Sequence, residues 1–215
     1  MSLKEEDMDL ILLQEHGLWK FEADTLEELF PGYDYTVQCA DEDDPLPNDV
    51  RLRGRAGVAI LWKKSLSHLA ASHPDGSERI NVVTLKCSPQ PICLINVYMP
   101  PQGTPDFKLN FGSHLDQIHE IVQKFRDHII ILGGDLNGSI SSPKYPHDHQ
   151  LQATLKDLKL ELPQNYPSAN TFFSHNGSTR HLDYILCSHP DLLNVKDPLH
   201  IAANTSAHCP VPANA

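Results

Sequence analysis

Asp135 and Asn137 are the pair of residues whose types and spacing first suggest chemistry. They follow an apolar run at residues 129–132 and two glycines, a pattern typical of a buried strand and its end. Side chains two residues apart point the same way wherever the extended geometry persists. A carboxylate beside an amide can bind water, a metal ion or phosphate. An ordinary Asp/Asn turn has the same pattern, so the pair alone leaves both interpretations open.

Other polar side chains occupy the same position at or just past the ends of further apolar runs: Glu15, Asn96, Tyr98 and Asp183. In a sandwich, strand ends from both sheets meet along one edge, and loops at such an edge carry function. Carboxylates that converge there repel each other unless a cation joins them, and oxygen-rich clusters suit Mg²⁺ or Mn²⁺. Acid–base catalysis on phosphate also needs a histidine held by a carboxylate, and His208, near the end of the chain, is the candidate.

The length, composition and net charge of the chain limit the class of protein it can be. A chain of 215 residues with ordinary composition predicts a single globular domain over residues 1–215, not a disordered or fibrous protein. The net charge of −11 disfavours tight binding of a polyanion through bulk electrostatics. It does not exclude a nuclease whose carboxylates reach phosphate through a cation.

The five cysteines are odd in number and show no C-x-x-C spacing. The chain begins with charged residues rather than a secretory leader, and no run approaches the ~20 apolar residues that a membrane helix needs. We therefore expect an intracellular protein, cytoplasmic or nuclear, with reduced thiols and no membrane partner.

The periodicities predict an α/β domain in which strands dominate. Expected strands cover residues 9–13, 33–39, 57–62, 80–87, 91–98, 129–132, 171–173 and 181–187. Expected helices cover residues 22–30, 113–125 and 151–160, the second of them capped by Ser113. Residues 139–149 are expected to form a loop. In it, His147, Asp148 and His149 are expected to be exposed to solvent and not to bind a metal ion.

Six short motifs follow one another along the chain: residues 13–16 (LQEH), 57–60 (GVAI), 95–100 (INVYMP), 134–137 (GDLN), 182–185 (LDYI) and 206–210 (SAHCP). Their order resembles the endonuclease/exonuclease/phosphatase superfamily, which has the deoxyribonuclease-I-like fold. Within it, the first two motifs look most like endonuclease domains of non-long-terminal-repeat (non-LTR) retrotransposons.

The resemblance implies a four-layer α/β sandwich, with two mostly antiparallel sheets flanked by helices. It also implies divalent-metal-dependent phosphodiester hydrolysis on DNA with Mg²⁺ or Mn²⁺, and a reverse-transcriptase domain as partner in a longer parent protein. Glu15 and Asp135 would hold the metal, and Asp135 would also orient or deprotonate the attacking water.

Further roles follow from the same resemblance. Asn137 would hold the scissile phosphate, and Tyr98 would donate to a phosphate oxygen. Asn96 would support the Tyr98 loop and contribute to substrate binding. Asp183 would pair with His208, keeping the imidazole oriented and cationic.

Four arginines would line a nucleic-acid groove if they cluster at the site edge: Arg51, Arg53, Arg55 and Arg180.

Two departures from the family pattern bear on activity. The closing motif normally reads Ser-Asp-His, whereas this chain has Ala207 in the middle position. Losing that acid is expected to weaken cation binding and to displace His208. The usual first strand and most of the last are also expected to be missing. The expectation is an impaired endonuclease domain. The open alternatives are an inactive binding or scaffold remnant of the same fold and a phosphatase for a small phosphorylated substrate.

Overall fold

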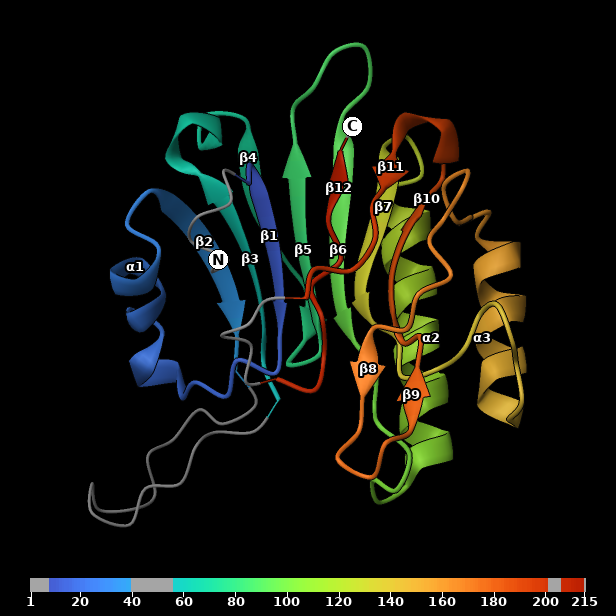
Figure 1. The fold of residues 1–215 in the computed structure, drawn as a ribbon. Helices are drawn as coiled ribbons and strands as arrows, with labels where there is room; N and C mark the ends of the chain where they lie inside the picture. Colours follow the sequence, from blue (N-terminus) through green and yellow to red (C-terminus); the bar gives the residue numbers. More distant parts are fainter. Residues whose placement is uncertain (1–7, 40–55, 201–205, 215) are drawn as a thin grey trace, which may run out of the picture.

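The computed structural model describes residues 8–39, 56–200 and 206–214, whose elements form four layers (Figure 1). The first sheet has the order β1-β3-β2, with strands β1 (Leu10–Gln14), β2 (Tyr33–Gln38) and β3 (Val58–Lys63). The second has the order β10-β7-β6-β5-β4, with strands β4 (Ala70–Ser77), β5 (Ile80–Leu85), β6 (Ile92–Tyr98), β7 (Ile129–Asp135) and β10 (Asp183–Cys187). Among these pairings only β6–β7 is parallel.

Helices cover the outer faces of the two sheets: α1 (Thr25–Leu29) lies against the first, and α2 (Phe107–Lys124) and α3 (Pro146–Asp157) lie against the second (Figure 1). The short elements are η2 (Lys20–Glu22), η3 (Lys64–Leu66), η4 (Pro190–Leu192), the pair β8 (Phe172–Phe173) with β9 (Thr179–Arg180), and the pair β11 (Asn194–Val195) with β12 (Ala213–Asn214). No helix in the described part of the chain is both long and apolar enough to cross a membrane.

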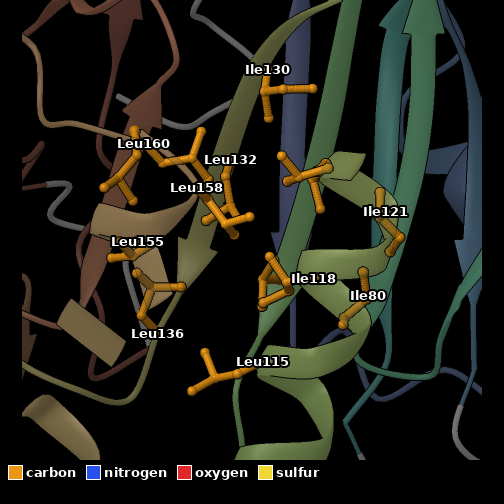
Figure 2. Close-up of a cluster of buried hydrophobic side chains, with 14 of the residues drawn as sticks. Ile80, Leu115, Ile118, Ile121, Ile130, Leu132, Leu136, Leu155, Leu158 and Leu160 are labelled. Carbon is orange, nitrogen blue, oxygen red and sulfur yellow. The ribbon is translucent and has the colours of Figure 1, made fainter. Parts of the chain in front are cut away.

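Three apolar clusters fill the spaces between the four layers. The largest joins the second sheet to α2 and α3, where Ile118 and Ile121 of α2 face Ile80 and Ile130 of the sheet (Figure 2). A second, around Trp62, lies between the two sheets, and a third, around Leu26, joins α1 to the first sheet. The four-layer α/β sandwich is therefore confirmed in the described residues.

Several local predictions differ from the structure. α2 begins at Phe107 rather than near Ser113, because Asp106 adopts a left-handed conformation that ends the preceding loop and starts the helix there. α3 begins at Pro146, so His147 and Asp148 lie buried in its first turn and not in a solvated loop. The expected helix at residues 22–30 is only η2 and the short α1, and β4 was not predicted.

A glycine sets the path of the strand that leads to Asp135. Gly134 has a φ of +134°, and a Cβ atom there would lie 2.0 Å from the carbonyl oxygen of Val97 on the neighbouring strand. Only glycine allows this conformation and this close approach. The contact keeps the ends of β6 and β7 side by side, so that Tyr98 is opposite Asp135.

Two buried asparagines connect the sheets. Asn96 is fully buried; its Nδ2 donates to the carbonyl oxygens of Leu13 and Ala59, both at 2.9 Å, and its Oδ1 accepts from Gln14 Nε2 at 2.6 Å. Its neighbour across β5–β6, Asn81, donates to the carbonyl of Thr36 at 3.1 Å. Apolar packing alone does not fix how one sheet is placed on the other, whereas these directional hydrogen bonds do.

We predict that Asn96→Ala lowers the free energy of unfolding by about 2–4 kcal/mol, since it leaves buried polar groups without their partner. Urea denaturation would measure the change. Asn170→Ala is the matched control, because the Asn170 amide bonds Thr179 Oγ1 on the exposed surface. A loss no larger for Asn96→Ala than for the control would contradict a role in joining the sheets.

Candidate active site

Three neighbouring strands end in one row of functional side chains. Tyr98 is the last residue of β6, Asp135 the last of β7 and Asp183 the first of β10. The register places Tyr98 opposite Asp135 and Asp183 opposite Asp135. Residues far apart in sequence therefore meet at one edge of the second sheet because of strand pairing alone.

His208 lies against this row and is bound by Asp183. Its Nδ1 is 2.9 Å from Asp183 Oδ2 and 3.1 Å from Oδ1, and its Nε2 is 3.9 Å from Asp135 Oδ2. The imidazole is oriented by one carboxylate and turned toward the other. This pairing was predicted from the resemblance, and the geometry supports it.

The segment that carries His208 is fixed by β8 and its neighbours. The Phe173 N–H donates to the Ala207 carbonyl at 2.8 Å, and the Cys209 N–H donates to the Thr171 carbonyl at 2.8 Å. Although position 207 carries alanine instead of an acid, backbone bonds and Asp183 hold His208 in contact with the row.

Thr171 is a positioning residue that the sequence did not indicate. It is fully buried, and its hydroxyl accepts the N–H groups of Leu182 at 3.0 Å and Asp183 at 3.1 Å. These bonds fix the start of β10 and so the place of Asp183. A threonine in a short apolar run has no pattern that separates this role from ordinary strand packing.

Asn137 orients Asp135. Its N–H donates to Asp135 Oδ1 at 2.9 Å, while its Nδ2 donates to Asp135 Oδ2 at 3.1 Å and to the Met99 carbonyl at 2.8 Å. Asn137 has a φ of +44°, a conformation that asparagine tolerates better than most residues. Both Nδ2 hydrogens are engaged, so the phosphate contact that the resemblance implies would replace one of these bonds.

Glu15 enters the site from the first sheet. It follows β1 directly and accepts a hydrogen bond from the hydroxyl of Tyr98. Burial and this carboxylate both raise the pKa of Tyr98, so its hydroxyl remains protonated and acts as a donor. The contact links the two sheets at the functional edge.

The site concentrates negative charge. Burial, and then the nearby Asp183 carboxylate, raise the pKa of Asp135. Burial opposes the imidazolium of His208, but the hydrogen bond and charge of Asp183, with Asp135 and Glu15, outweigh it and raise the pKa of His208. The carboxyl groups of Glu15, Asp135 and Asp183 thus surround one imidazole, so the site is rich in oxygen donors.

This donor set fits a divalent cation. Ligand atoms of Asp135, Asp183 and His208 all lie within 4.8 Å of one another. Asp135, which the resemblance predicts as a metal ligand, belongs to this group, whereas Glu15, the other predicted ligand, does not and instead accepts the hydrogen bond of Tyr98. Oxygen donors of this kind suit Mg²⁺ or Mn²⁺ rather than a soft metal.

The structure brings together most of the predicted site residues: Glu15, Tyr98, Asp135, Asn137, Asp183 and His208. Asn96 is the exception, since its side chain is 0% exposed and fully occupied between the sheets, so it supports the site without reaching a substrate. Of the four arginines considered, Arg180 lies in β9, and the other three lie outside the described residues.

An α/β sandwich with carboxylates, a paired imidazole and a tyrosine at one strand edge is the architecture of a class of phosphate-ester hydrolases. The chain belongs to the endonuclease/exonuclease/phosphatase family, whose model matches residues 2–208. No curated protein sequence matches it significantly.

Solved structures of the same fold include proteins that act on DNA. The endonuclease domain of TRAS1, a telomere-specific non-LTR retrotransposon, is 20% identical with a TM-score of 0.67, covering 95% of this chain and 84% of that one. The AP endonuclease LMAP from Leishmania major is 21% identical with a TM-score of 0.74, covering 97% and 78%. The 3′ phosphatase NExo from Neisseria, bound to a product DNA hairpin, is 19% identical with a TM-score of 0.69, covering 96% and 88%. At these identities the likeness shows the fold.

We predict that Asp183→Asn lowers the pKa of His208, because burial, which disfavours the imidazolium, then meets less opposing negative charge. An NMR titration of the His208 ring in metal-free protein would measure the change. Asp191→Asn, at an exposed carboxylate bonded to Gln164, is the control and leaves this pKa unchanged. An unaltered titration of His208 in Asp183→Asn would be inconsistent with the observed pair.

Proposed function

We propose that this chain hydrolyses phosphodiester bonds of DNA with a divalent metal ion, as an endonuclease domain of the non-LTR retrotransposon type. The observation that carries the proposal is the row of Tyr98, Asp135 and Asp183, with His208 bonded to the last and Glu15 to the first. Membership of the family supports phosphate-ester hydrolysis, and the motifs at residues 13–16 and 57–60 support the retrotransposon type.

The residues of the site would each supply a different part of the hydrolysis. Asp135 is buried with a raised pKa and oriented by Asn137, which suits a carboxylate that accepts a proton from water. Asp183 raises the pKa of His208, which favours its cationic form, and the cation can donate from Nε2 to a phosphate oxygen. Tyr98 supplies a hydroxyl donor beside them. A divalent ion on Glu15 and Asp135 would neutralise charge that develops on the phosphate.

DNA as the substrate is supported by two features. Structural neighbours are a retrotransposon endonuclease domain, an AP endonuclease and a phosphatase bound to a DNA hairpin. Arg180 is also a cation near the site: its backbone is joined to the acidic row, since its carbonyl accepts the Thr171 N–H at 3.0 Å and Thr171 in turn bonds Asp183, while its guanidinium lies over the Tyr145 ring. With a net charge of −11, the chain depends on such local cations and on the metal ion to bind phosphate.

Ala207 favours a second candidate function, that of a domain with the same fold but weak or no catalytic activity. The methyl group of Ala207 cannot bind a cation, although its backbone is bonded to Phe173 in the segment that holds His208. We propose that the missing acid weakens metal binding and leaves the arrangement of Asp183 and His208 intact. Loss of such a group commonly costs ~10–100-fold in metal affinity or activity.

The test of the proposed function is nicking of supercoiled plasmid DNA with Mg²⁺ or Mn²⁺. We expect Asp135→Asn to reduce the nicking rate by at least ~100-fold, because the carboxylate both binds the metal and accepts a proton. Asp127→Asn is the matched control, since Asp127 is exposed and precedes the opposite end of β7. No metal-dependent nicking, or equal rates for both variants, would argue against the proposal.

The role of Ala207 is tested by restoring the acid. We expect Ala207→Asp to raise the nicking rate at limiting Mg²⁺ by ~10–100-fold and to lower the Mg²⁺ concentration required for half-maximal rate. Ala207→Asn, of nearly the same size but without the charge, serves as control and gains much less. If neither variant changes the metal dependence, Ala207 does not limit catalysis.

A further inference from the structure

We propose that Arg79 forms a phosphate subsite beside the candidate active site and binds the DNA phosphate next to the scissile one. This proposal rests on the proposed function, and it identifies a residue that neither the sequence motifs nor the metal cluster includes.

The backbone of Arg79 extends the functional row by one strand. It precedes β5, its carbonyl accepts the Tyr98 N–H at 2.8 Å, and its own N–H donates to Ser77 Oγ at 3.3 Å. From Arg79 the row continues through Tyr98 to Asp135. The backbone of Arg79 is thus two strand spacings, about 10 Å, from that of Asp135, a separation that an arginine side chain can largely span.

The guanidinium is held over Tyr98 without being neutralised. Its Cζ lies 4.7 Å from the centroid of the Tyr98 ring, and Nη1 donates to the Tyr98 carbonyl at 3.4 Å. Within residues 8–39, 56–200 and 206–214, no carboxylate lies within ion-pair distance of Arg79. The side chain is half-buried, so the cation–π contact orients it while other N–H donors remain for a ligand.

Phosphate is the ligand that this arrangement fits. A guanidinium presents paired N–H donors that match two phosphate oxygens, and an oriented one loses less entropy on binding. The guanidinium of Arg79 flanks the acidic row on the Tyr98 side. A cation one strand away from the acidic centre suits a strand with several phosphates better than a single small phosphate ester.

The experiment compares Arg79→Gln and Arg79→Lys by fluorescence anisotropy with a labelled DNA duplex, using Ca²⁺ in place of Mg²⁺ and several salt concentrations. We expect Arg79→Gln to weaken binding about tenfold, as for a lost charged hydrogen bond, and to reduce the salt dependence by about one released counterion. Arg79→Lys keeps the charge, so the salt dependence is retained with a smaller loss of affinity. Arg126→Gln, at an exposed residue before the opposite end of β7, leaves binding unchanged.

The outcomes separate the subsite from the proposed function. If the unmodified chain nicks DNA and Arg79→Gln binds it with unchanged affinity and salt dependence, the subsite is wrong and the proposed function stands. A fall in kcat alone, with KM and affinity unchanged, would also overturn the phosphate contact, since Arg79 would then only position Tyr98. If the unmodified chain neither binds nor nicks DNA, both proposals fail together.

Discussion

The site depends on one buried amide, that of Asn96, which fixes how the two sheets sit against each other. Apolar packing between sheets has no directional preference, whereas this amide makes three hydrogen bonds to β1 and β3. Its partners Leu13 and Gln14 immediately precede Glu15, and Tyr98 comes two residues after Asn96. The same bonds that join the sheets therefore bring Glu15 to the Tyr98 hydroxyl, so the acidic edge of the candidate site is a consequence of how the core is closed.

The carboxyl groups at this edge of the second sheet repel one another, and the fold alone does not offset that repulsion. Asp135 and Asp183 are directly opposite on neighbouring strands, where like charges are destabilising, and burial adds to the cost for Asp135. His208 compensates for one carboxylate through its bond to Asp183. The carboxyl groups of Asp135 and Glu15 remain, and a divalent cation bound between them, as we propose, would offset the cost of bringing these groups together.

The sequence predicts the strands that are continuous apolar runs, and its motifs predict the residues at their ends. It fails where tertiary contacts decide. β4 contains proline, glycine and few apolar side chains, and it forms because β5 offers it a pairing edge. Asn96 has the residue type of a substrate ligand, and only its burial shows otherwise. Thr171 and Arg79 act through a hydroxyl bonded to another strand and a ring contact, neither of which leaves a periodic signal.

The segment around Ala207 positions the imidazole of His208 without using the side chain at position 207. His208 is fixed by Asp183, by the backbone bonds of its neighbours to β8 and Thr171, and by the Phe172 ring, whose centroid lies 4.9 Å from its own. None of these contacts involves the side chain at position 207. An acid there would therefore contribute to the cation and not to the histidine, which is why its replacement by alanine is compatible with an intact Asp183–His208 pair. We therefore expect substitution at this position to change metal binding without disturbing the geometry of Asp183 and His208.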